Sequence, residues 1–189
     1  MKSDSELIWK TREKEVVADC RIFDVVKEIK ENGDRAHDFY VLESNDWVNI
    51  IPLTGEGEVV MIEQYRHGSE TITLEIPGGI VDDGESALDA ARREMNEETG
   101  FDSATIHRIS VCEPNPAFLR NICTSFLALN VAWTKPTAFD EHEDIRVRLI
   151  PLHEIPALIR DGIIKHSLVI VAFHALHLHR NLLPEHIHY

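Results

Sequence analysis

Residues 79–101 read GIVDDGESALDAARREMNEETGF, and this stretch decides the fold. Its apolar residues Leu88, Ala91 and Met95 recur at the spacing of one helical face, which predicts an amphipathic helix. An acidic residue and a serine stand at its start, where they suit the helix dipole and the free backbone N–H groups. Gly100 stands where glycine commonly ends a helix.

The other side of this helix carries Glu94, Glu97 and Glu98. Carboxylates three and four residues apart share one side and repel one another by about 0.2–0.5 kcal/mol per pair, so a compensating cation is expected. Mg²⁺ suits carboxylate oxygens together with substrate phosphates. Gly79 and its neighbour Gly78 allow close backbone approach, and a main-chain carbonyl of this pair is an expected further ligand. The pattern predicts metal-assisted attack on a phosphorus centre.

Two more residues of this stretch are expected to orient the cluster. Arg93 cannot usefully approach a metal ion as a cation, so it is expected to pair with Glu85 or with a ligand carboxylate and fix its direction. The alternative for the whole stretch is an amphipathic helix with a solvated acidic face.

Composition limits the class of protein. The 189 residues suffice for a domain with its own core, and the net charge of −14 argues against a nucleic-acid-binding surface. Bound metal ions would reverse the local field that otherwise repels a phosphate substrate. The three cysteines, Cys20, Cys112 and Cys123, form no CxxC pair, and the N-terminus has no apolar signal segment. No apolar run reaches the length of about 18 residues needed to span a membrane, so we expect a cytoplasmic protein.

Strands and helices follow one another along the chain without repeats. Strands are predicted at 11–19, 21–30, 39–42, 47–53, 59–65, 71–76, 105–111, 122–131 and 145–150. Helices are predicted at 152–160 and 167–180 in addition to the first. Such mixed elements predict a layered α/β/α or α+β sandwich.

The opening stretch matches every fixed position of a known signature: glycine, five residues, glutamate, seven residues, then REUXEEXGU, with U bulky and apolar. The matching residues are Gly79, Glu85, Arg93, Glu94, Met95, Glu97, Glu98, Gly100 and Phe101. In this the chain resembles the Nudix hydrolases. The resemblance implies a loop–helix–loop that holds Mg²⁺ or Mn²⁺ and hydrolyses a nucleoside diphosphate linked to another group.

Flanking motifs resemble one branch of that family, the ADP-ribose pyrophosphatases. They are QYRHG at 64–68, LEIPGG at 74–79, and Pro116 sixteen residues beyond Gly100. Gly78 stands where the branch usually has alanine, and the resemblance implies that the backbone of this residue is a metal ligand. The resemblance runs from about Trp47 to the last helix and is only general before it.

An acidic loop, DEHEDIRV at 140–147, resembles the segment from which the branch takes its catalytic carboxylate. A metal-activated water benefits from a general base, and Glu141 is the expected residue, with Glu143 as the alternative. Glu98 is the third candidate catalytic carboxylate. A solvated acidic turn is the other interpretation of this loop.

Three residues outside the signature are candidates for substrate binding. Arg66 suits phosphate oxygens because its guanidinium binds them in pairs, although a surface ion pair is the alternative. Glu75 is expected to bind a ribose or base, or else to form an ion pair. Trp47 is expected to stack on an adenine or simply to pack in a strand.

These observations lead us to expect a Nudix α/β/α sandwich with a mixed sheet, its main domain at 46–189 and N-terminal strands at 1–45 for dimerisation. The expected activity is Mg²⁺-dependent cleavage of nucleoside diphosphate sugars, most of all of ADP-ribose into AMP and ribose 5-phosphate. The resemblance also implies a homodimer whose N-terminal strands exchange. The alternatives are a housecleaning pyrophosphatase of nucleoside triphosphates or dinucleoside polyphosphates, and a sensor that binds ADP-ribose without turnover.

Overall fold

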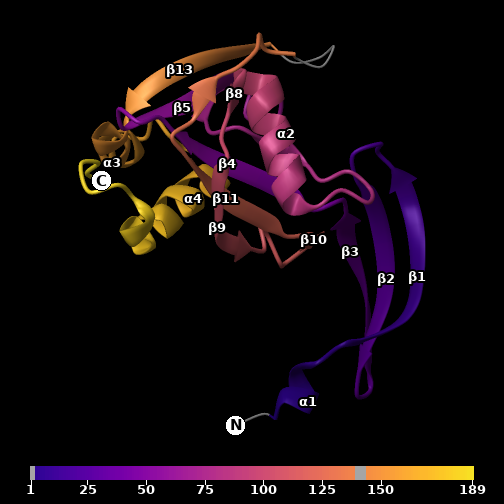
Figure 1. Cartoon of the computed structure of the whole chain (residues 1–189). Coiled ribbons are helices and arrows are strands. Elements are labelled where there is room, and N and C mark those ends of the chain that lie inside the picture. Colours follow the sequence, from indigo (N-terminus) through magenta and orange to yellow (C-terminus); the bar gives the residue numbers. More distant parts are fainter. Residues whose placement is uncertain (1–2, 139–143) are drawn as a thin grey trace. The chain divides into compact units, whose positions relative to one another are not determined.

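A computed structural model describes residues 3–138 and 144–189, and the chain divides into two units (Figure 1). The first unit comprises Met1–Asn45 and Glu113–Ile122, and the second comprises Asp46–Cys112 and Cys123–Tyr189. The first unit therefore contains a segment from the middle of the sequence as well as the N-terminal strands.

The first unit is a four-stranded sheet in the order β1-β2-β3-β10. Its elements are α1 (Asp4–Leu7), β1 (Lys10–Asp19), β2 (Asp24–Asn32), β3 (Arg35–Glu43) and β10 (Leu119–Arg120). β1, β2 and β3 pair antiparallel, and β10 pairs parallel with β3. Gly33, at φ +60°, allows the tight turn between β2 and β3, where the sequence predicts a turn.

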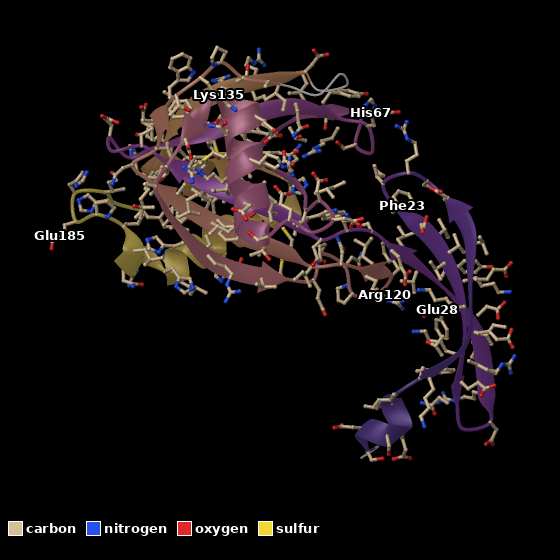
Figure 2. The ribbon with its side chains drawn as sticks, turned by 45° about the vertical axis from the view of Figure 1, so that its right-hand side comes forward. Phe23, Glu28, His67, Arg120, Lys135 and Glu185 are labelled. Atoms are coloured by element: carbon tan, nitrogen blue, oxygen red, sulfur yellow. The ribbon has the colours of Figure 1, made fainter. Side chains whose placement is uncertain are left out.

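A buried carboxylate, Glu28, ties β10 to this sheet. Arg120 Nη2 lies 2.9 Å from Glu28 Oε1, and Nη1 of the same arginine contacts Glu43 (Figure 2). Lys30 Nζ lies 2.9 Å from Glu28 Oε2. Burial raises the pKa of Glu28, but hydrogen bonds from Lys30 and Arg120 outweigh it, and the net shift is downward.

The second unit is built on a mixed sheet in the order β13-β5-β4-β11-β9, with β6 beside β5 and β7 beside β4. The strands are β4 (Trp47–Leu53), β5 (Glu58–Arg66), β6 (Thr71–Glu75), β7 (Gly78–Ile80), β9 (Thr105–Cys112), β11 (Cys123–Leu129) and β13 (Ile145–Pro151). β4 and β11 are parallel, and the other pairs are antiparallel. A separate pair, β8 (Phe101–Asp102) with β12 (Ala132–Trp133), follows the first long helix.

Helices cover both faces of this sheet (Figure 1). On one face, Met95 of α2 (Ala87–Thr99) belongs to a core cluster with Ile50 and Phe126. On the other face, Phe173 of α4 (Ser167–Leu178) clusters with residues of β4, of β11 and of α3 (Ile155–Arg160). Fully burying one such side chain stabilises the fold by about 1.5–3 kcal/mol. This layering confirms the predicted α/β/α sandwich with a mixed sheet.

Most predicted elements are present with ends shifted by a few residues. The helix predicted at 152–160 is a 3₁₀ turn, η1 (Leu152–Glu154), followed directly by α3. The prediction missed the other short elements, namely α1, β7, β8, β10, β12 and the 3₁₀ turn η2 (Arg180–Leu182). Elements of two to four residues show too little periodicity for a sequence pattern to reveal them. Among the described residues, no helix has the length and apolar character needed to cross a membrane.

Candidate active site

The helix α2 is held at both ends as its sequence predicts. The Ser86 side chain accepts a hydrogen bond from the backbone N–H of Asp89 at 3.1 Å, which caps the N-terminus. Gly100 ends the helix at φ +76°, a conformation that costs glycine little. A Cβ at Gly100 would also lie within 2.1 Å of the carbonyl oxygen of Lys135. The helix is therefore fixed in length, and its acidic side is fixed in direction.

Arg93 lies at the centre of that acidic side. Its Nη1 donates to Glu94 Oε1 at 2.8 Å and to Glu97 Oε2 at 3.2 Å, while Nε and Nη2 hold both oxygens of Glu85 at 3.1 Å. Nη2 also donates to the carbonyl oxygen of Ile80 at 3.0 Å. Hydrogen bonding with Glu85 is the largest cause that raises the pKa of Arg93 and lowers the pKa of Glu85. Arg93 thus makes both of the contacts considered from the sequence.

Glu98 is held by the backbone of β7. It is buried, and its Oε2 accepts a hydrogen bond from the N–H of Gly78 at 3.0 Å. A Cβ at Gly78 would lie 2.3 Å from the carbonyl oxygen of Val48, and a Cβ at Gly79 would lie 2.3 Å from Glu94 Oε1. Both glycines therefore permit contacts that alanine would disturb, one with the backbone of β4 and one with the carboxylate of Glu94.

The donors around α2 fit a hard divalent cation. Carboxylate oxygens of Glu94, Glu97 and Glu98 stand on one side of the helix beside the glycine backbone of β7. Within residues 3–138 and 144–189, no three acidic, histidine or cysteine side chains are already arranged as a metal site. Arg93 supplies the positive charge between these carboxylates in the structure.

A cavity of about 530 Å³ is lined on one side by Gly78, Gly79 and Ile80. Gly78 also contacts Glu98 and Ile80 contacts Arg93, so β7 stands between the cluster and the cavity as the structure describes it. Trp47, Arg66 and Glu75, the three predicted substrate-binding residues, all line it. Its other lining residues are Val48, Asn49, Gly68, Ser69, Thr73, Ile76, Cys123, Lys165, His166, Leu168 and Val169. This size and mainly apolar lining are typical of small-molecule sites.

Arg66 and Glu75 form a paired contact inside the cavity. Arg66 Nε and Nη2 donate to the two oxygens of Glu75 at 2.8 and 2.7 Å, and Thr73 Oγ1 donates to Glu75 at 2.6 Å. Burial raises the pKa of Glu75, but these hydrogen bonds and the charges of Arg66 and His166 outweigh it, and the net shift is downward. The ion pair that was the alternative for both residues is therefore present, and both residues line the cavity.

Comparison with known proteins identifies the family. The model of the NUDIX domain matches residues 45–169, about two thirds of the chain. This chain belongs to the Nudix family. The predicted resemblance is therefore confirmed, and the helix α2 with its flanking loops is the Nudix signature of this protein.

Individual Nudix relatives cover most of the chain. The ADP-ribose pyrophosphatase of Bacillus subtilis is 29% identical over 79% of this chain and 82% of its own length. The methanol dehydrogenase activator of Bacillus methanolicus is 30% identical over 71% and 74%. The crystal structure of an ADP compounds hydrolase superimposes with a TM-score of 0.82 at 22% identity, covering 92% and 94% of the two chains, which shows the shared fold.

The predicted catalytic bases of this Nudix protein, Glu141 and Glu143, lie outside the described residues. The polar cavity residues that sequence reasoning missed include Asn49, Lys165 and His166. A polar residue within the apolar run WVNIIPL was a signal for Asn49. The sequence contains no such signal for Lys165 and His166, because two polar residues before a helix also suit an ordinary solvated loop.

Proposed function

We propose that this Nudix protein hydrolyses the pyrophosphate bond of nucleoside diphosphate sugars, with ADP-ribose the preferred substrate and AMP and ribose 5-phosphate the products. The observation that carries the proposal is the glutamate cluster around Arg93, which the backbone of β7 connects to a cavity of about 530 Å³. The names of the relatives support it, because one is an ADP-ribose pyrophosphatase and the structural neighbour is an ADP compounds hydrolase.

Mg²⁺ or Mn²⁺ is the proposed cofactor. Glu94, Glu97 and Glu98, with the main-chain oxygen of Gly78, would hold the ion or ions. When bound, such a cation polarises the diphosphate and neutralises charge on the leaving phosphate. Glu141, with Glu143 as the alternative, is the proposed general base.

Three side chains of the protein would orient the metal ligands and bind the substrate. Arg93 keeps the directions of Glu85 and Glu94 fixed, so that the ligand carboxylates do not need to be ordered at each turnover. Arg66, already oriented by Glu75, places positive charge in the cavity next to an otherwise acidic cluster. Trp47 offers an aromatic face for a base.

A substrate panel tests this proposal. ADP-ribose, ADP-glucose, GDP-mannose, NADH and diadenosine polyphosphates are incubated with the protein and Mg²⁺ or Mn²⁺, and the products are separated by chromatography. We expect fastest turnover of ADP-ribose, with AMP as one product. Preferred cleavage of nucleoside triphosphates or dinucleoside polyphosphates would support the housecleaning alternative. Tight binding of ADP-ribose without AMP formation would support the sensor.

We also propose that the protein is a cytoplasmic homodimer associated through its first unit. That unit exposes large apolar side chains, and β1 is exposed along its whole length, which is costly for an isolated sheet. The exposed residues include Val16, Val17, Ile22 and Tyr40. The three cysteines are free thiols, as is common in reducing compartments. A monomeric mass by light scattering at micromolar concentration would contradict the dimer.

A further inference from the structure

Two free thiols face each other across the sheet of the second unit. Cys112 ends β9 and Cys123 begins β11, and the two residues are register partners where these strands pair antiparallel. Their side chains therefore stand on the same face of the sheet. Neither cysteine forms a disulfide in the structure. The third cysteine, Cys20, is exposed and belongs to the first unit.

The separation of register partners suits a disulfide bond. Directly opposite residues of an antiparallel pair have Cα atoms about 4.5–5.5 Å apart, and a disulfide accepts about 4.4–6.8 Å. Their Cβ atoms are also about 4.5–5.5 Å apart, whereas a disulfide needs about 3.5–4.5 Å. A bond between Cys112 and Cys123 therefore requires the two strand ends to approach by roughly 1 Å. Such a bond carries strain, and strain makes a disulfide easier to reduce.

Burial makes the two thiols unequal. Cys123 is 1% exposed, whereas Cys112 is only partly buried. Burial raises the pKa of the Cys112 thiol. The pKa of Cys123 is raised to about 12, mainly by burial and then by the charge of Cys112, which acts on it only because the two sulfurs are close. Since the thiolate is the reactive form, an external oxidant reacts first at Cys112, and slowly.

Cys123 also belongs to the wall of the cavity. It lines the cavity together with Trp47, its parallel register partner on β4. Trp47, Cys123 and Cys112 thus follow one another across three neighbouring strands. Protein interiors are close-packed, so a pull on Cys123 toward Cys112 changes the shape of the wall that Cys123 and Trp47 form.

We propose that Cys112 and Cys123 form a modification site for small disulfides such as glutathione disulfide, which oxidise the pair to an intramolecular disulfide that weakens substrate binding in the cavity. The Cys112 thiolate attacks one sulfur of glutathione disulfide, which forms a mixed disulfide and releases one glutathione thiolate. Cys123 then loses its proton to solvent and attacks the Cys112 sulfur, which releases the second glutathione thiolate. The two protein thiols lose two electrons, and one glutathione disulfide gains them. The effect on substrate binding rests on the proposed function, whereas formation of the disulfide does not.

Peptide mapping tests whether the bond forms. The full-length protein is incubated with glutathione disulfide overnight, the remaining thiols are alkylated, and the digest is analysed by mass spectrometry without reduction. We expect the peptides of Cys112 and Cys123 to be linked with the loss of two hydrogen atoms, and dithiothreitol to separate them. Cys123→Ser should instead keep glutathione on Cys112, because no second thiol displaces it. Cys112→Ser should leave the buried Cys123 unmodified.

Cys20→Ser is the matched control, because Cys20 is the exposed cysteine. The link between Cys112 and Cys123 should form equally well in this variant. Modification of Cys20 alone, or glutathione that stays on Cys112 in the unaltered protein, would overturn the proposal, and so would a pair that remains reduced. If Cys123→Ser does not fold, the peptide map of the unaltered protein decides alone.

The effect on the cavity is measured by comparing the oxidised and the reduced protein. We expect KM for ADP-ribose to rise by about 10-fold on oxidation, which is the low end of the effect of one methylene group in a pocket, with little change in kcat. Dithiothreitol should restore KM, and Cys112→Ser, which keeps Cys123 in the cavity wall, should not respond to the oxidant. An unchanged KM of the fully linked protein would overturn the effect on binding.

Failure of this inference can be told apart from failure of the proposed function. Absence of ADP-ribose cleavage by the reduced protein refutes the proposed function alone, because peptide mapping detects the disulfide without turnover. The affinity for AMP, measured by calorimetry, then replaces KM in the comparison of the oxidised and reduced protein. Equal affinities would overturn the effect on binding.

Discussion

The glutamate cluster on α2 and the cavity wall at the start of α4 belong to one candidate site but are built in different ways. The cluster comes from a single local stretch, in which each contact of Arg93 spans at most 13 residues. The wall depends on a contact between Asn49 and Leu168, which are 119 residues apart. Local spacing therefore builds the glutamate cluster, whereas the fold of the whole second unit builds the wall of the cavity.

The largest effect on activity is expected when a glutamate of the cluster on α2 loses its charge. Glu98→Gln keeps the shape of a buried side chain that accepts a hydrogen bond from Gly78, but removes its charge. A bound cation contributes several kcal/mol of charge stabilisation, so kcat with Mg²⁺ should fall by about 100-fold or more. The measurement is AMP release from ADP-ribose at saturating metal.

Asp89→Asn in the first turn of the same helix is the control for Glu98→Gln, and it should retain most of the activity. Equal activity of Glu98→Gln and the unaltered protein would contradict the role of the cluster.

Arg93→Lys tests whether the fork of Arg93, rather than its charge, orders the cluster. Lysine cannot hold Glu85, Glu94 and the carbonyl of Ile80 together. We expect the Mg²⁺ concentration for half-maximal activity to rise by about 10- to 100-fold. Arg92→Lys is the neighbouring control, because Arg92 binds only Asp102 in the hydrogen bonds that the structure describes. A similar shift in both variants would show a general effect of the helix.

Gly78→Ala tests the junction between the two regions, since Gly78 pairs with Asn49 on β4 and also donates to Glu98. Its Cβ would meet the backbone of β4, which cannot move as freely as a side chain. We expect a loss of about 1–3 kcal/mol of unfolding free energy, measured by urea denaturation. At Gly68 a Cβ would meet no atom within 4 Å, so Gly68→Ala should be nearly neutral.

The smallest effect is expected for Glu75→Gln, which should lower the free energy of unfolding by an amount that depends on pH. The pKa of Glu75 is lowered in the folded protein, so its ionised form stabilises the fold above the unfolded pKa, and this contribution is lost as the pH falls through the folded value. We expect the variant to be about 1–2 kcal/mol less stable at about pH 7, because the ion pair with Arg66 is lost. The loss is this small because Arg66 is partly exposed and solvent screens the pair.

Below the lowered pKa of Glu75 in the folded protein, the stabilities of Glu75→Gln and the unaltered protein should converge, as measured by urea denaturation at decreasing pH. A constant difference from neutral to acidic pH would show that the charge of Glu75 is not what stabilises the pair.

Most of helix α2 could be predicted from the sequence. Ser86 and Gly100 cap it as expected, and Ala91 and Met95 are buried on its apolar face, because capping and periodicity depend only on nearby residues. The sandwich fold was predicted for the same reason, as the sum of such local patterns. The prediction of the apolar face was wrong for Leu88, which is 45% exposed in the first turn of the helix.

The pairing of Arg66 with Glu75 was left as one of two alternatives. β5 and β6 form an antiparallel hairpin in which Gln64 faces Thr73, so the two charged side chains lie on the same face. That register depends on where the turn falls, which the sequence left open. Asn49 was missed because its partners come from α4 through the folding of the whole sheet.

Residues 113–122 belong to the first unit although they lie in the middle of the sequence, and this limits where the protein can be truncated. The chain leaves the second unit after Cys112 and returns at Cys123, and Arg120 depends on Glu28 and Glu43 for its partners. Truncation at Asn45 would leave β10 without the strand it pairs with and this arginine without either carboxylate. Excising a catalytic fragment therefore requires replacing residues 113–122 with a short turn as well as removing the N-terminus.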